Sequence, residues 1–318
     1  MKKGCKIALI TGGSLFGLGI VCIIIGAGIN GFDLSKLSSG KIEYEKKTLE
    51  YTDSFSAIDI HSISDDVKLV KSEDGKTRIE YYDSKDGRIR YDIQRKYASA
   101  DEKGKPELFA KQKDDRKWYE YLLSFDFDSF NDDRAVTVYV PGEEYDSLSL
   151  ESVSGDVSAE IPLRIKNNVT LNSTSGNINA ENQTAGVRSV YTSISGNVRI
   201  QNSASGDINA SAVSGKVSLG KCTAKNGVIV GSISGNVNLE DIRSELTKTE
   251  TVSGGVQVQK VDSKNIRIKT ISGDISGSIG FGGTYDIRTV SGDVEHPSSV
   301  TNAGNFILET TSGDITLK

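Results

Sequence analysis

The chain has 318 residues, enough for about two ordinary domains, and its net charge of −5 provides no basic surface for nucleic acid. Its 33 glycines, its 4 prolines and its frequent, regularly placed apolar residues are typical of an all-β protein rather than a disordered one. The only histidines are His61 and His296, which disfavours histidine-based catalysis. Cys222 is the single cysteine after residue 22, which excludes a disulfide within the body of the chain.

Residues 7–29 predict one transmembrane helix, because these 23 residues carry no charge. At about 1.5 Å per residue they would span about 34 Å, enough for the hydrocarbon core of a bilayer. Lysines at positions 2, 3 and 6 precede the span, so the positive-inside rule places residues 1–6 in the cytoplasm and the rest outside. We therefore expect a single-pass plasma-membrane protein with an extracytoplasmic body.

Two other interpretations of this segment stay open. A cleaved signal peptide would need a small-x-small cleavage site, of which Gly26-Ala27-Gly28 is a poor version. Lipidation of Cys22 is disfavoured because Val21, not a small residue, precedes it. If the segment is a membrane helix, Gly13 and Gly17 form a small-xxx-small pattern through which two copies could associate.

A linker, residues 30–44, leads to a region that we expect to cap the repeats described below, residues 45–144. Within it, residues 58–69 resemble one repeat with Asp65 in place of a glycine, and residues 79–82 and 136–141 predict further strands. A charged insertion at 84–133 contains Trp118, Tyr119 and Tyr121. These aromatic side chains predict either a small local core or a platform for a partner.

From residue 145 to 318 the sequence repeats with a period of 19 to 21 residues, which predicts a β-solenoid of eight to nine coils. Each repeat carries Ser-Gly, a polar residue and then Val or Ile, and its glycines are Gly155, Gly176, Gly196, Gly215, Gly235, Gly254, Gly273, Gly292 and Gly313. In several repeats, apolar residues seven and five positions before the glycine, such as Leu148 and Leu150, alternate as in a β-strand. Stacked coils would cover one another's apolar edges.

A tenth Ser-Gly, at Gly206, falls half a period out of step and predicts a second corner in each coil. Other residues near that position are Gly186, Gly227, Asn265, Gly283 and Gly304. Because glycine and asparagine tolerate a positive φ, we expect them to form this corner, with two strands per repeat. The last predicted strand ends at Lys318, so we expect an open C-terminal coil that another molecule could cover.

The Ser-Gly-Asp/Asn-Val/Ile repeat, the strand ending in Val140-Pro141 and the single N-terminal apolar segment together resemble the "putative adhesin" family. This is a family of bacterial envelope β-strand-repeat proteins built on a domain of unknown function. The resemblance covers about residues 58–318 outside the insertion. It implies a β-solenoid fold and an envelope location, and it brings no catalytic residues and no cofactor.

Corner aspartates Asp274, Asp293 and Asp314 would lie near one another along one edge and could bind calcium. We favour the alternative that they are turn residues bonded to their own backbone, because Asn, Lys and Gly occupy the same position in other coils. The acidic, aromatic run at 125–133 lacks the glycine of a calcium loop and is better explained as an alternating strand. We predict no catalytic residue and no metal or cofactor, and we interpret Cys222 as a small buried residue.

These features favour a membrane-anchored, non-catalytic binding, adhesion or scaffold module of the cell envelope. Its expected partners are the membrane, a cell-wall glycan or an envelope protein, and not nucleic acid. The alternative is the ectodomain of an envelope-stress sensor that acts through a membrane partner, since the six-residue cytoplasmic tail is too short for a signalling domain. A polysaccharide-active enzyme ranks third, because no acidic cluster interrupts the repeat.

Overall fold

The computed structural model describes residues 42–97, 104–116, 134–142, 144–280, 282–300 and 304–318. The chain divides into two compact units. The described part of the first comprises residues 42–44, 84–89 and 114–116, in which the Lys85 ammonium lies 2.8 Å from the Glu43 carboxylate. The predicted transmembrane helix at 7–29 lies outside the described residues, and no helix among the described ones is long and apolar enough to cross a membrane.

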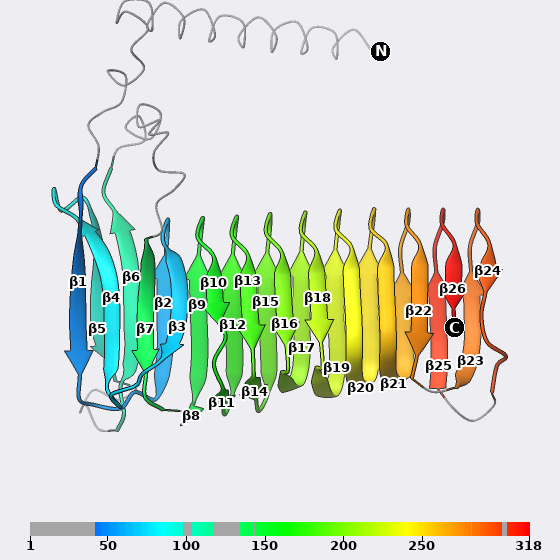
Figure 1. The fold of residues 1–318 in the computed structure, drawn as a ribbon, viewed down its shortest axis with the longest axis horizontal. Helices are drawn as coiled ribbons and strands as arrows, with labels where there is room; N and C mark the ends of the chain where they lie inside the picture. Colours follow the sequence, from blue (N-terminus) through cyan, green and yellow to red (C-terminus); the bar gives the residue numbers. More distant parts are fainter. Residues whose placement is uncertain (1–41, 98–103, 117–133, 143, 281, 301–303) are drawn as a thin grey trace, which may run out of the picture. The chain divides into compact units, whose positions relative to one another are not determined.

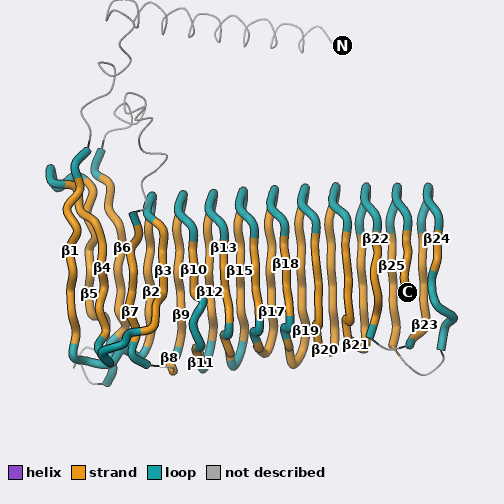
Figure 2. Tube along the Cα trace, viewed as in Figure 1, coloured by secondary structure: helices purple, strands orange, loops and turns teal. Residues whose placement is uncertain are grey.

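The second unit, Glu45–Asp83, Arg90–Lys113 and Asp133–Lys318, is the predicted all-β solenoid. Figures 1 and 2 show its parallel strands stacked coil upon coil. The coils form three parallel sheets, here called A, B and C. In each complete coil the chain forms a strand of sheet A, turns at the Ser-Gly corner, forms a strand of sheet B, and returns through a short strand of sheet C. The repeat therefore has three strands rather than the two expected from the sequence.

Sheet A consists, in spatial order, of β6 (Glu107–Asp114), β2 (Ala57–Ser62), β9 (Ser147–Ser152), β12 (Asn168–Ser173), β15 (Arg188–Ser193), β17 (Ala204–Ala212), β19 (Thr223–Ser232), β20 (Val237–Thr251), β21 (Val256–Lys269), β25 (Gly304–Glu309) and β23 (Gly283–Arg288). Strand β6 lies inside the predicted charged insertion and joins the stack beside β2.

Sheet B consists of β7 (Ala135–Val140), β3 (Asp66–Lys71), β10 (Val157–Ala159), β13 (Ile178–Glu181), β16 (Val198–Gln201), β18 (Val217–Gly220), the first parts of β20 and β21, β22 (Ile275–Ile279), β26 (Ile315–Leu317) and β24 (Val294–Glu295). Sheet C contains β8 (Glu144–Tyr145), β11 (Leu163–Ile165), β14 (Gln183–Ala185) and parts of β17, β19, β20 and β21. Outside the coils, β4 (Thr77–Ser84) pairs antiparallel with β7, β1 (Tyr44–Tyr51) pairs with β4, and β5 is Ile89–Lys96.

The core lies between the three sheets and follows the predicted alternation. Leu148 and Leu150, and their equivalents Val228 and Val230, are at most 1% exposed. Burying one such side chain stabilises the fold by about 1.5–3 kcal/mol before the entropy of ordering it is subtracted. Most coils repeat an apolar pair at these positions, so neighbouring coils bury one another's apolar side chains; in one coil Thr247 and Thr249 replace the pair.

A row of buried hydroxyl groups joins the coils at the Ser-Gly corner. The Ser193 hydroxyl donates to the carbonyl of Gly176 in the preceding coil, at 2.9 Å, and accepts from the Gly196 backbone N–H of its own coil, at 2.9 Å. Ser173 makes the same pair of bonds with Gly155 and Gly176. The recurring Ser or Thr three residues before the glycine therefore satisfies buried backbone groups of two coils at once.

Seven of the nine corner glycines are required for space rather than for a positive φ; Gly292 and Gly313, in the last coils, also have a positive φ, of 148° and 154°. A Cβ atom on Gly196 would lie 2.0 Å from the Gly176 carbonyl oxygen, and one on Gly215 would lie 1.9 Å from that of Gly196. Neither residue has a positive φ. The stacked corners approach so closely that no side chain fits between them.

The predicted second corner lies between sheets C and A, as at Gly186 between β14 and β15, but the positive φ expected there is wrong. Gly186, Gly227, Asn265, Gly283 and Gly304 do not have a positive φ. The left-handed turn instead lies between sheets B and C, where five non-glycine residues have φ between 49° and 60°: Asn182, Asn202, Lys221, Asp241 and Lys260. Because lysine or aspartate occupies three of the five positions, a search for glycine and asparagine does not find this turn.

The last coil in the sequence is not the last in space. Strand β25 pairs with β21 on one side and with β23 on the other, and β26 lies in the same way between β22 and β24. The coil at 304–318 is therefore inserted before the coil at 283–295, which corrects the expectation of an open end formed by the final strand. Part of the true end strand, β23, is covered: the Val300 N–H donates to the Gly283 carbonyl at 2.9 Å.

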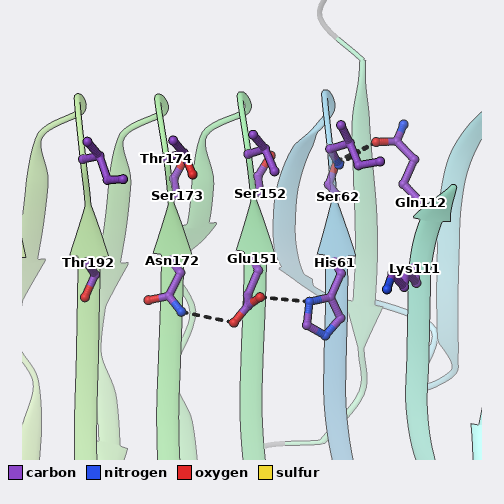
Figure 3. A pocket seen from close by; sticks show the side chains of 13 residues that line it. His61, Ser62, Lys111, Gln112, Glu151, Ser152, Asn172, Ser173, Thr174 and Thr192 are labelled. Carbon is purple, nitrogen blue, oxygen red and sulfur yellow. Dashed lines mark hydrogen bonds and ion pairs between the residues drawn. The ribbon is translucent and has the colours of Figure 1, made fainter. Parts of the chain in front are cut away.

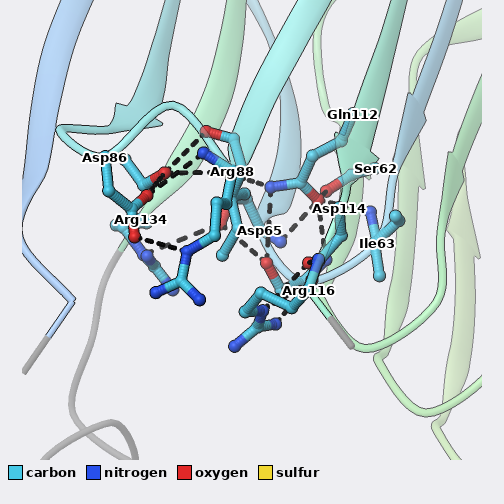
Figure 4. A network of polar contacts seen from close by, with 12 residues as sticks. Ser62, Ile63, Asp65, Asp86, Arg88, Gln112, Asp114, Arg116 and Arg134 are labelled. Carbon is cyan, nitrogen blue, oxygen red and sulfur yellow. Dashed lines mark hydrogen bonds and ion pairs between the residues drawn. The ribbon is translucent and has the colours of Figure 1, made fainter. Parts of the chain in front are cut away.

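A buried polar network closes the other end of the stack (Figure 4). Asp65, which occupies the glycine position of the first coil, is 1% exposed. Its carboxylate accepts hydrogen bonds from the Tyr91 hydroxyl at 3.1 Å and from the Gln112 amide at 2.9 Å, and the Arg134 guanidinium lies 3.6 Å away. Burial, followed by the charge of Asp65, raises the pKa of Tyr91 well above its usual value.

Candidate functional site

The outward side of sheet A carries a groove beside the Ser-Gly corner. Its apolar rim consists of the residues two positions before the corner glycines, Val153, Ile194, Val213, Ile233, Val252 and Ile271, each 38–50% exposed. Its floor consists of the outward residues four positions before the glycines, among them Glu151, Asn172, Thr192, Ser211 and Gly231. Alternation along the strand places both sets on the same side of the sheet.

The groove crosses the strands, so it runs along the stack. One hollow of about 410 Å³ extends from Lys111 and His61 to Thr192. A second, of about 530 Å³, continues from Thr192 to Lys269 and Ile271. Because the two hollows share Thr192 and Ile194, they form one continuous groove from β6 to β21.

Small side chains keep the middle of the groove open, where Thr192, Ser211 and Gly231 follow one another on neighbouring strands. Unlike the corner glycines, Gly231 has room for a side chain: a Cβ atom would meet only the Glu250 carbonyl oxygen, at 3.6 Å, and its φ is not positive. The fold therefore does not require glycine at this position. A glycine without a structural reason is what we expect if the floor of the groove stays open for a ligand.

At one end of the groove His61 lies beside Glu151 (Figure 3), and Asp59 contacts the other nitrogen of its ring. The His61 Nδ1 atom lies 2.9 Å from Glu151 Oε2, and its Nε2 atom lies 2.9 Å from Asp59 Oδ1. The other oxygen of Glu151 accepts a hydrogen bond from the Asn172 amide at 3.1 Å. A neutral imidazole carries one N–H, so both contacts are hydrogen bonds only when His61 is protonated. Burial, followed by the charge of Asp59, raises the pKa of nearby Glu107.

The sequence did not single out this cluster, because His61 and Glu151 are 90 residues apart. The available signal was their position in the repeat. Glu151 stands four residues before Gly155, and His61 stands four residues before Asp65, which replaces that glycine in the first coil. Aligning the degenerate first coil with the others would have placed the two side chains on neighbouring strands.

Of the predicted site residues, the structure brings the three corner aspartates together, in the spatial order Asp274, Asp314, Asp293. Asp274 Oδ1 accepts from the Asp314 N–H, and Asp314 Oδ1 accepts from the Asp293 N–H, both at 2.9 Å. They bond the backbone of the neighbouring coil, not their own as expected. Within the described part of the chain no group of three or more acidic, histidine or cysteine side chains is arranged to hold a metal ion.

The aromatic residues Trp118, Tyr119 and Tyr121 lie outside the described residues. Cys222 is buried, as expected, and burial raises the pKa of its thiol to about 11.

The stacked parallel coils define a β-solenoid with a groove on the outward face of sheet A. The chain belongs to the Toastrack DUF4097 family, whose model matches residues 55–207 and 205–318. This confirms the resemblance seen in the repeat. No curated protein matches the chain in sequence.

Two solved structures from Parabacteroides distasonis ATCC 8503 have a similar fold. One, described as a "putative adhesin", is 11% identical, with 87% of this chain and 98% of that chain covered and a TM-score of 0.50. The other, described as a "Putative lipid binding protein", is 12% identical, with 86% and 97% covered and a TM-score of 0.50. At this identity the likeness supports the fold alone.

Proposed function

We propose that the chain is a non-catalytic binding module of the cell envelope, anchored by residues 7–29, with the groove of sheet A as its binding site. The observation that carries the proposal is the continuity of the groove over neighbouring coils. Strands in a sheet are about 4.8 Å apart, so the groove repeats the same rim at that interval. A linear polymer lying along the stack would meet an equivalent contact at every coil.

The lining favours an uncharged or weakly charged polymer such as a cell-wall glycan. The carboxylates of Glu151 and Glu250 are matched by the cations Lys111 and Lys269, so the groove has no dominant sign of charge. The floor presents hydroxyl and amide groups to sugar hydroxyls, and the rim presents aliphatic side chains to the apolar faces of sugar rings. The strands between β9 and β21 pair on both sides, so a peptide cannot add to them as a further strand.

Binding rather than catalysis also fits the chemistry of His61. Its ring contacts Asp59, Glu151 and Phe109, and in the described part of the chain no serine, threonine or cysteine side chain is hydrogen-bonded to it. The family and the solved structures named above support the same reading, since two of their descriptions refer to adhesion or lipid binding.

The test uses the full chain in phosphatidylcholine nanodiscs, sedimented with purified cell wall. We expect saturable binding. Filling the floor with S211Q and G231Q should weaken it at least tenfold, while S158Q and S276Q, on the outward side of sheet B, should leave it unchanged. Equal binding by the floor variant and the native chain would exclude the groove. Absence of binding by the native chain would exclude cell-wall glycan as the ligand.

A further inference from the structure

Two cations stand together on the outward side of sheet B, on the surface that the groove does not use. The residue after each corner glycine and the residue two further on point outward from this sheet. Between Asp156 and Asp274 these positions hold only two charged residues, Arg199 and Lys216. The uncharged residues directly after the glycine are Asn177, Asn197, Asn236 and Gly255. Those two positions further on are Ser158, Asn179, Ser218, Asn238, Gln257 and Ser276.

The two cations belong to neighbouring coils and line one pocket. Arg199 lies on β16 opposite Ser218 of β18, and Lys216 directly precedes β18. The pocket has a volume of about 370 Å³, and its polar side chains are those of Asn177, Asn179, Asn197, Arg199, Lys216 and Ser218. Among the described residues, no acidic side chain lines it. Arg199 forms no ion pair with an acidic side chain in the described part of the chain.

In this pocket the side-chain amide oxygens of the corner asparagines accept hydrogen bonds from the backbone of the next coil. Asn177 Oδ1 accepts from the Asn197 backbone N–H at 2.9 Å, and Asn197 Oδ1 accepts from the Lys216 backbone N–H at 2.9 Å. The NH₂ group of Asn177 also donates to the Asp156 carboxylate at 3.2 Å, and that of Asn197 donates to Asn177 Oδ1 at 3.2 Å. The second N–H of each amide is therefore the one left to meet a ligand. The Lys216 ammonium lies 3.0 Å from the Asn238 amide oxygen once that amide is oriented to satisfy both of its ends.

We propose that this pocket binds a phosphate group that forms part of a larger ligand. A guanidinium and an ammonium supply charge-assisted hydrogen bonds, and the amide groups supply further donors from another direction, which suits the several acceptor oxygens of a phosphate. The volume exceeds that of a single phosphate, so the remainder accommodates the group that carries it. The phosphate can belong to a polyol-phosphate polymer or to a phospholipid headgroup. Because it concerns a different sheet, the inference is independent of the groove.

The test titrates the full chain in phosphatidylcholine nanodiscs with three probes at 0.15 M salt, where long-range attraction between exposed charges is screened. The probes are inorganic phosphate, poly(glycerol phosphate), and liposomes of phosphatidylglycerol in phosphatidylcholine. We expect weak binding of inorganic phosphate and tighter binding of at least one larger probe. The larger probe that binds identifies the source of the phosphate.

The variant R199Q/K216Q should lose at least tenfold in affinity for the probe that binds best. The control R164Q/K225Q makes the same change in net charge at exposed positions away from sheet B, and it should bind as the native chain does. The proposal is overturned if the native chain binds none of the probes, if R199Q/K216Q binds them undiminished, or if the control loses as much. Both variants alter only exposed side chains, so circular dichroism should show an unchanged fold.

Discussion

The side-chain oxygen of Gln112 lies 2.6 Å from the backbone nitrogen of Ile63 and 3.0 Å from that of Ser64, and it accepts a hydrogen bond from each. In the next coil the equivalent N–H groups, those of Val153 and Ser154, donate to the backbone carbonyls of Ser62 and Ile63. The first coil has no such corner before it. Gln112 therefore replaces the missing coil with one amide side chain, and so ends the stack without leaving buried donors unpaired.

Replacing Gln112 with leucine should leave the N–H groups of Ile63 and Ser64 without an acceptor, and should remove the amide that donates to Asp65. Leaving buried polar groups unpaired costs about 1–3 kcal/mol each, so we expect a loss of about 3 kcal/mol, confined to the first coils. Hydrogen exchange measures it residue by residue: the Ile63 and Ser64 amides should exchange faster, and those of β20 should not. The exposed neighbour Lys111 provides the control K111L. Unchanged protection of Ile63 in Q112L would contradict the role of this side chain.

The two kinds of glycine should respond in opposite ways to alanine. In G215A the new methyl group would lie 1.9 Å from the Gly196 carbonyl oxygen, so the coils must separate, and we expect a loss of at least about 3 kcal/mol. In G231A the nearest atom is at 3.6 Å, and the loss of flexibility in the unfolded chain should stabilise the protein by about 0.4–1 kcal/mol. Thermal denaturation compares the two. If both variants were equally stable, the close stacking of the corners would be wrong.

Cross-linking tests the order of the last coils. Ser272 and Ser312 form a parallel bridge, as do Ser291 and Ser312. Adjacent strands lie within the distance that a disulfide spans, and strands two positions apart do not. In a chain carrying C5S and C22S, the pair S272C/S312C should oxidise readily and S272C/S291C should not. The reverse result would mean that the coils stack in sequence order.

Cys222 should be inert at mildly alkaline pH. Burial raises its pKa to about 11, so fewer than about one thiol in a hundred is ionised at pH 8.5, and only the thiolate reacts. Because the pKa of the folded state is raised, this group's contribution to stability is present below about pH 8.5 and is lost as the pH rises towards 11. Iodoacetamide should modify the C5S/C22S chain slowly until it is denatured. Modification at the rate of a free cysteine would show that the site opens.

The solenoid was predictable because its determinants are local and repeated. The alternation at Leu148 and Leu150 recurs in most coils, as does the hydroxyl exemplified by Ser193, so these copies support the same assignment. The reason for the corner glycine was not predictable, since it depends on the distance between stacked coils rather than on φ. The turn at Lys221 and Asp241 was missed because these residues give no local sign of a positive φ.

The site was less predictable than the fold. The groove arises from side chains that are small at Ser211 and Gly231, and nothing in the repeat indicates that those positions adjoin a hollow. The contact of His61 with Glu151 required the alignment of the first coil, which lacks the glycine. The insertion of β25 between β21 and β23 could not be foreseen, because equivalent repeats fit either order.

Protection of the groove rim by ligand tests the central claim most directly. In the C5S/C22S chain, a single cysteine is placed at Ile233 on the rim (I233C) or at Ser158 on sheet B (S158C), and its alkylation rate is measured with and without purified cell wall. We predict at least fivefold slower alkylation of I233C with cell wall present and no change for S158C. Equal rates for I233C with and without cell wall, under conditions where the chain co-sediments with it, would contradict binding through the groove.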